Sequence, residues 1–178
     1  MTESAELEGD CLLVKSTGGQ LGGIADNLTF VYQDAPPTSA VELRLADLQT
    51  AEYLAPVASV QFRESLSEGS RFAGISFRYF ARIQALPQLR IVESHAAETR
   101  LNKGPINWHA LPEARFRVER RGDEFTALWS RDGQDWFIET QYRFEEPLMP
   151  TMLAGVAVHG EGQTVELTAC ELGVFPKG

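Results

Sequence analysis

Tyrosine and arginine side chains recur at strand-like positions along the chain, and these groups can bind the oxygen atoms of a ligand. A guanidinium presents planar donors that suit hydroxyl and carboxylate oxygens. Several of them on one face of a sheet would form a polar cleft, whereas pairing with glutamates would leave only a solvated surface, and both interpretations stay open. The residues are Tyr32, Arg44, Arg63, Arg78, Arg90 and Arg117, and the glutamates are Glu42, Glu64, Glu93 and Glu119.

Aromatic residues supply the second set of candidates. Trp108 and His109 lie in a connection bounded by glycine and proline, residues 103–112, of the kind that rims a sheet. An aromatic ring presented there could stack on the apolar face of a sugar, and the alternative is that Trp108 closes one end of the core. Trp129 and Trp136 flank a predicted hairpin, and we expect one or both of them in the core by parity with Phe125 and Ile138. The candidate ligand-binding residues are therefore Tyr32, Arg63, Arg90, Trp108, His109, Arg117 and Trp129.

The residues that could serve nucleophilic or metal catalysis do not follow the spacing of any catalytic or metal-binding motif. His95, His109 and His159 are far apart, and no serine or cysteine lies in a nucleophile-elbow motif. We therefore predict no catalytic residue, no metal and no cofactor. Cys11 and Cys170 lack the spacing of zinc or redox sites, and we expect two free, buried thiols in a reducing compartment.

A tight hairpin is predicted at residues 130–136, SRDGQDW. Asp132 and Gly133 tolerate the positive φ angles of a tight turn, and the Ser130 hydroxyl can bond to the turn backbone. The favoured interpretation is structural, and the alternative is a calcium or sugar site.

Short alternating runs between turn signals predict an all-β chain. We predict strands near residues 11–16, 27–33, 40–48, 57–64, 71–80, 88–93, 115–120, 124–131, 136–142, 153–159 and 164–175. The only segment of helix-forming composition, residues 46–54, ends before Pro56 and allows at most a turn or two of helix.

About eleven strands cannot form one open sheet without long exposed edges, so a two-sheet sandwich is expected. The 178 residues fit a single domain, residues 1–178. On the strand near residues 115–120, Phe116 and Val118 mark the buried face, and Arg115, Arg117 and Glu119 mark the opposite face.

Charge and hydropathy exclude some partners. The 25 acidic and 16 basic residues give a net charge of -9, which repels nucleic acid and anionic lipid. The arginines between residues 115 and 121 are interleaved with acids and predict a charge-balanced face, with a local anion site as the alternative. No apolar run is long enough to span a membrane and the start resembles no signal peptide, so we expect a cytoplasmic protein unless a leader was removed.

Four stretches in order carry a family resemblance: ADNLTFVYQ (25–33), VQFRESLSEGSRFAGI (60–75), FRVERRGDEFTALWSRDGQDW (116–136) and MLAGVAVHG (152–160). They resemble the concanavalin A-like lectin and glucanase jelly rolls, and more narrowly the small domains that include the yeast "regulation of enolase" protein. The resemblance covers nearly the whole chain. It implies an antiparallel jelly-roll sandwich whose first and last strands are neighbours, which would bring Cys11 and Cys170 near each other.

The same resemblance implies a function for one face, because many relatives bind carbohydrate on the concave sheet. The paired E-x-D-x-E carboxylates of the superfamily's glucanases are absent here. We therefore predict a non-catalytic module that binds a carbohydrate or a similar polyhydroxylated ligand. The alternatives are an intracellular protein-interaction or regulatory domain, for example a homodimer, and thirdly a glycoside hydrolase or polysaccharide lyase.

Overall fold

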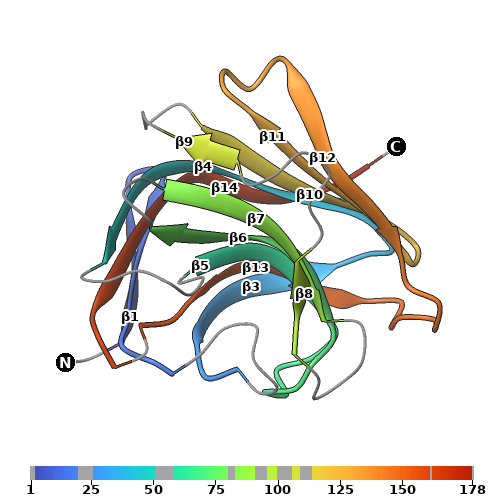
Figure 1. The fold of residues 1–178 in the computed structure, drawn as a ribbon, viewed down its shortest axis with the longest axis horizontal. Helices are drawn as coiled ribbons and strands as arrows, with labels where there is room; N and C mark the ends of the chain where they lie inside the picture. Colours follow the sequence, from blue (N-terminus) through green and yellow to red (C-terminus); the bar gives the residue numbers. More distant parts are fainter. Residues whose placement is uncertain are drawn as a thin grey trace.

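Two antiparallel sheets pack face to face in the computed structural model, as a jelly-roll sandwich (Figure 1). The structure describes residues 3–19, 26–50, 58–79, 83–90, 96–99, 106–108, 114–160 and 162–177. No helix occurs among these residues, so none of them forms a helix that could cross a membrane. The predicted fold class is confirmed.

Sheet A contains seven strands in the order β1-β2-β14-β4-β10-β11-β12. Their bounds are Ser4–Glu8 (β1), Cys11–Ser16 (β2), Val165–Pro176 (β14), Thr38–Thr50 (β4), Arg115–Arg121 (β10), Glu124–Ser130 (β11) and Trp136–Arg143 (β12). The first predicted strand, β2, pairs with the last strand, β14, as the resemblance implies.

Sheet B has the order β3-β13-β5-β6-β7-β8, and β9 also pairs with β7. The bounds are Thr29–Ala35 (β3), Met152–Val158 (β13), Ala58–Arg63 (β5), Phe72–Tyr79 (β6), Ile83–Arg90 (β7), Glu98–Thr99 (β8) and Ile106–Trp108 (β9). Pro87 lies in β7 between the residues that pair with β9 and those that pair with β8. Proline has no N–H to donate, and at this position neither the pairing of β7 with β8 nor its pairing with β9 loses a hydrogen bond.

The core lies between the sheets and is made by alternate residues of each strand. Phe116 and Val118 of β10 are buried against Val60 and Phe62 of β5, as part of one continuous apolar cluster. Arg115, Arg117 and Glu119 face the other way and are only partly buried. The predicted alternation on β10 is thus confirmed, because side chains on a strand point alternately to its two faces.

Three short strands, β1, β8 and β9, are not among the predicted strands. β1 carries four exposed residues out of five, so it lacks the apolar alternation that marks a strand. The helical turn predicted for residues 46–54 is wrong for residues 46–50, which belong to β4, a strand that pairs with β14. Pairing with a neighbouring strand outweighs the local helix propensity there. Residues 51–54 lie outside the described residues.

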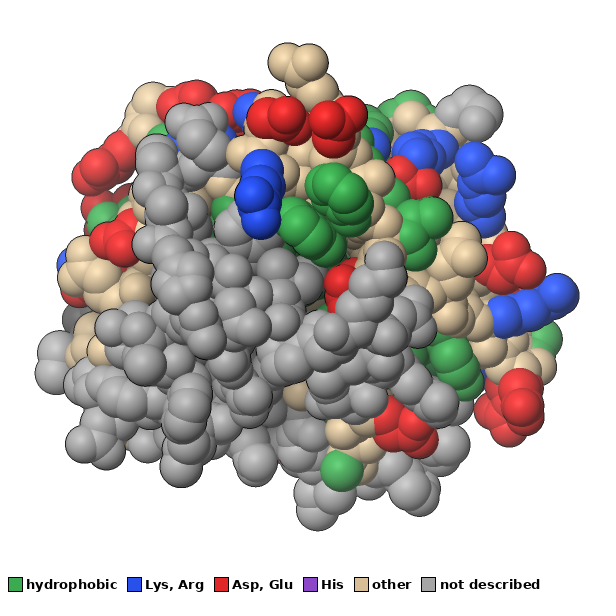
Figure 2. All heavy atoms as spheres, turned by 45° about the horizontal axis from the view of Figure 1, so that its top comes forward, with side chains coloured by type: hydrophobic (Ala, Val, Ile, Leu, Met, Phe, Trp, Pro, Cys, Tyr) green, Lys and Arg blue, Asp and Glu red, His purple; other side chains and the backbone are tan. Residues whose placement is uncertain are grey.

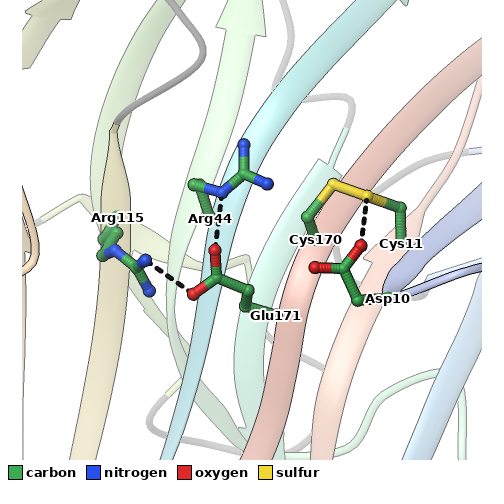
Figure 3. The surroundings of a disulfide bond; sticks show 6 residues. All are labelled: Asp10, Cys11, Arg44, Arg115, Cys170 and Glu171. Carbon is green, nitrogen blue, oxygen red and sulfur yellow. Dashed lines mark hydrogen bonds and ion pairs between the residues drawn. A yellow bond between two sulfur atoms is a disulfide. The ribbon is translucent and has the colours of Figure 1, made fainter.

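The expectation of two free thiols is wrong, because Cys11 and Cys170 form a disulfide (Figure 3). They stand directly opposite each other on β2 and β14, with their Cα atoms 3.9 Å apart. Strand register decides this pairing, and register is invisible in two cysteines separated by 159 positions. The reducing compartment inferred from free thiols loses its support.

Candidate carbohydrate-binding face

The outer face of sheet B brings together residues from five neighbouring strands. Because Val60 and Phe62 of β5 point into the core, Ser59, Gln61 and Arg63 point outward. Register places one transverse row across this face, which runs over β3, β13, β5, β6 and β7. The row consists of Tyr32, Gly155, Gln61, Gly74 and Gln88.

Neither glycine in this row can be replaced by a larger residue without movement. A Cβ atom added to Gly74 would lie 2.6 Å from the Val60 carbonyl oxygen and 2.7 Å from the Gln61 Cβ. One added to Gly155 would overlap the Val31 carbonyl oxygen. Glycine in a strand interior marks close backbone approach. Gln61, which lies between the two glycines in this row, is itself fully buried.

A pocket of about 340 Å³ opens on the β3 side of this face. One wall is aromatic, since Phe30 and Tyr32 stack with their ring centroids 5.2 Å apart and Tyr32 is 44% exposed. Residues two apart on a strand share a face, which is why the two rings lie side by side. The pocket is lined by Asp26, Asn27, Leu28, Phe30, Tyr32, Arg63, Leu66 and Glu68.

The base of the pocket rests on a buried cluster of three charged residues. Asp26 accepts hydrogen bonds of 2.7 and 2.6 Å from the two terminal nitrogens of Arg90, and one of 2.6 Å from Arg63 Nη1. All three side chains are nearly inaccessible to solvent. Charge-assisted hydrogen bonds of this kind hold both partners in one orientation, so Arg63 is fixed where it meets the pocket.

The same arginines hold the loop between β5 and β6 by its backbone. Arg63 donates to the Ser67 carbonyl at 2.9 Å, and Arg90 donates to the carbonyls of Glu68 and Ser70 at 3.0 and 3.1 Å. Both guanidinium groups also lie over the Phe72 ring. Leu66 and Glu68 therefore stand at the pocket on a loop with a fixed backbone.

Burial lowers the pKa of the Arg63 guanidinium, and the hydrogen bond and charge of Asp26 act against that shift. The nearby charge of Arg90 lowers this pKa further. Arginine stays protonated in proteins, so the cluster is ionic. The pocket therefore combines a fixed cation, the carboxylate of Glu68, the amide of Asn27 and two aromatic rings.

The structure places the predicted residues in three different regions. Tyr32 and Arg63 line the pocket, and Arg90 lies beneath it through Asp26. Trp108 is in β9, where only its backbone is described, and His109 lies outside the described residues. Trp129 packs against the core and stacks on Phe137, with ring centroids 4.7 Å apart.

Arg117 lies on the outer face of sheet A, where its guanidinium group is bound by neighbouring side chains of the protein. It donates two hydrogen bonds to Glu42 Oε2, at 2.8 and 2.5 Å, and its guanidinium carbon is 3.9 Å from the Trp136 ring centre. Nearby, Glu171 bridges Arg44 and Arg115 (Figure 3), and these hydrogen bonds lower the pKa of the Glu171 carboxyl. These ion pairs balance the charges on the outer face of sheet A, as the sequence predicts.

The described surface in Figure 2 shows acidic and basic side chains interspersed, without a patch of one sign. Arg120, another member of the arginine-rich segment, is buried and donates to the carbonyls of Gly122, Met149 and Pro150. These arginines serve internal contacts in the structure.

The hairpin between β11 and β12 projects from the top of the sandwich in Figure 1. The Ser130 hydroxyl accepts the Gly133 N–H at 2.9 Å, and Asp132 Oδ1 accepts the N–H groups of Gln134 and Asp135. These backbone donors lower the pKa of the Asp132 carboxyl. The polar groups of the turn thus bond to the turn itself, in agreement with the structural interpretation. Among the described residues, no cluster of His, Cys, Asp and Glu could hold a metal ion.

Sequence reasoning missed Asp26, Asn27, Phe30, Leu66 and Glu68. Asp26 precedes the predicted strand, and nothing in its spacing indicates that Arg63 and Arg90, 37 and 64 positions away, converge on it. Of the glutamates offered as partners for these arginines, Glu42 and Glu119 pair with Arg117, whereas Glu64 pairs with Arg71. Glu93 lies outside the described residues. The only available signal was Phe30 at two residues from Tyr32, which places both rings on one face.

Comparison with known proteins shows the fold. No family model matches the chain, and no curated protein matches it. A solved structure of a functionally unknown protein from Saccharomyces cerevisiae is 12% identical, with a TM-score of 0.75 over 98% of this chain and 92% of that one.

Two other solved structures show how differently this fold is used. The carbohydrate binding module CBM66 from Bacillus subtilis is 10% identical, with a TM-score of 0.58 over 97% of this chain and 91% of that one. The alginate lyase from Klebsiella pneumoniae is 11% identical, with a TM-score of 0.58 over 98% and 84% of the two chains. At these identities the likeness concerns the jelly-roll fold alone.

Proposed function

We propose that this protein is a carbohydrate-binding module, and that its ligand enters the pocket beside Tyr32. The stacked, partly exposed Phe30 and Tyr32 rings carry the proposal, because a sugar ring offers an apolar face that packs on such a surface. Asn27 and Glu68 line the same pocket and supply donors and acceptors for hydroxyl groups around that face. The pocket volume lies within the range of small-molecule sites.

Binding is favoured over hydrolysis by the state of the acidic residues in the pocket. Asp26 accepts three hydrogen bonds from guanidinium groups, so it is held as a structural counter-ion. Among the described residues that line this pocket, Glu68 is then the only other acid, whereas glycoside hydrolysis uses a pair of carboxyl groups across the scissile bond. The fold of a carbohydrate binding module is consistent with this role.

A glycan array followed by calorimetric titration tests the proposal. We expect Tyr32→Ala to weaken binding about tenfold, since it removes the aromatic surface, and Tyr32→Phe to retain most of the affinity. Phe137→Ala is the matched control, because Phe137 is an equally exposed aromatic residue on sheet A. Binding that is unchanged in Tyr32→Ala, or absent from the whole array, would contradict the proposal.

One surface favours the second candidate, a protein-interaction or regulatory domain of the "regulation of enolase" type. Phe137 and Ile138 on the edge strand β12 are 50% and 51% exposed, and an edge strand offers unpaired backbone groups to a partner. A second copy of the chain could pair along this edge. Light scattering would show a dimer that Ile138→Lys dissociates, and a monomer at all concentrations would reject pairing of copies.

A further inference from the structure

The loop between β5 and β6 places one carboxylate at the open pocket beside Tyr32. Glu68 lines that pocket, and its backbone carbonyl accepts hydrogen bonds from the Asp26 N–H at 2.8 Å and from Arg90 Nη1 at 3.0 Å. The side chain itself is exposed. Because the backbone is held at this point, the carboxylate moves only by rotation about its own side-chain bonds and stays at the pocket.

The carboxylate of Glu68 is the charge that this pocket presents to a ligand. In the described part of the chain, no lysine, arginine or histidine forms an ion pair with it. The other acid of the pocket, Asp26, is buried and pairs with the guanidinium groups of Arg63 and Arg90. A cationic group that enters the pocket can therefore reach Glu68 without displacing a partner from the protein.

Arg63, the cation that lines the same pocket, is directed into the protein. Its side chain is 3% exposed, and each of its three nitrogen atoms already donates to a protein oxygen. Nε donates to the Ser65 carbonyl at 3.4 Å, Nη1 to Asp26 at 2.6 Å and Nη2 to the Ser67 carbonyl at 2.9 Å. A ligand carboxylate would thus meet the exposed charge of Glu68 more readily than this buried guanidinium.

We propose that Glu68 makes the pocket selective for sugars that carry a protonated amine. This inference rests on the proposed function and names its ligand class. The ammonium group of such a sugar can donate a charge-assisted hydrogen bond to the Glu68 carboxylate. The stacked rings of Phe30 and Tyr32 favour the same ligand, because the face of an aromatic ring attracts positive charge. The net charge of -9 adds a long-range attraction for cationic ligands.

Titration with monosaccharides, followed by saturation-transfer NMR, tests the selectivity. The probes are glucosamine, its neutral counterparts N-acetylglucosamine and glucose, and the anionic glucuronate, all at millimolar concentration. At about pH 6 the carboxylate is ionised and the free amine is protonated. We expect glucosamine to bind about five- to tenfold more tightly than glucose, N-acetylglucosamine to bind as glucose does, and glucuronate to bind most weakly.

Glu68→Gln removes the charge but keeps the size of the side chain and the hydrogen bonds of its backbone carbonyl. The ratio of glucosamine affinity to glucose affinity should fall in this variant to about one. Glu124→Gln is the matched control, because it removes the same charge from an exposed position on β11 of sheet A and should leave the ratio as in the native protein. High salt should also lower the ratio in the native protein, since salt screens an exposed ion pair.

The outcomes separate this inference from the proposed function. If the native protein binds glucosamine and glucose equally, or if the preference survives in Glu68→Gln, the role of Glu68 is overturned, whereas a loss of binding in Tyr32→Ala would still support the module. If no sugar shows transfer, or if methylammonium, a cation without a sugar ring, binds as tightly as glucosamine, both the inference and the proposed function fail.

Discussion

At the scale of single residues, the fate of the charged side chains separates the two outer faces of the sandwich. On sheet A, Arg117 and Arg115 pair with Glu42 and Glu171 at partly exposed positions. On sheet B, Arg63 and Arg90 share one buried carboxylate, Asp26. A buried ionic group contributes little by comparison with an apolar one, but it is costly to disrupt because the partner charge stays buried.

Asp26→Asn is therefore expected to lower the free energy of unfolding by about 3–5 kcal/mol, since it removes a charge that two buried guanidinium groups use. Urea denaturation followed by circular dichroism measures this loss. Glu124→Gln is the control, because Glu124 pairs with Arg143 in solvent and should change stability by less than about 1 kcal/mol. If Asp26→Asn lowers the free energy of unfolding as little as Glu124→Gln does, the prediction is contradicted.

At the scale of strands, register decides which residues meet. Cys11 and Cys170, at opposite ends of the chain, become direct neighbours because β2 and β14 pair. The next residue, Glu171, has a φ of 52° in an irregular part of β14, which turns its carboxylate to Arg44 and Arg115. In the same way, register alone aligns Tyr32, Gln61 and Gln88 in one row.

Reduction of the disulfide should lower the free energy of unfolding by about 2–5 kcal/mol, because the bond closes a long loop in the unfolded chain. Urea curves with and without dithiothreitol measure the difference. The double variant Cys11→Ser/Cys170→Ser should unfold at the same urea concentration with or without reductant. Free thiols detected by a thiol reagent in the unmodified protein, after unfolding in urea without reductant, would contradict the bond.

At the scale of the whole molecule, one apolar cluster joins both sheets. It includes Val14 and Leu43 of sheet A together with Val60 and Ile75 of sheet B. Such a single core predicts one cooperative unfolding transition.

Unfolding in urea is therefore expected to give the same midpoint by tryptophan fluorescence and by far-UV circular dichroism. Because Trp108 lies in β9 of sheet B, the fluorescence is measured in a Trp108→Phe variant, in which Trp129 and Trp136 report on sheet A, whereas the dichroism signal reports on the strands of both sheets. Different midpoints would mean that the sheets unfold separately.

The fold was largely predictable from the sequence because alternation is a local property. Phe116, Val118, Phe125 and Ala127 are buried as their parity predicts, and Trp129 keeps that parity and packs against the core. Leu128 lies opposite Arg117 on the other face and is buried there without joining the core cluster. Strands without apolar alternation, such as β1, gave no such signal.

Composition and alternation are enough to establish an acidic chain of short strands that must close into two layers. The folded chain is needed to know which polar residues lie together, because the period of a strand shows which face a side chain takes but not which strand lies beside it. The pocket beside Tyr32 and the Asp26 cluster both combine residues from strands far apart in sequence. Their composition therefore follows from strand order and register, which are set by the packing of the whole core.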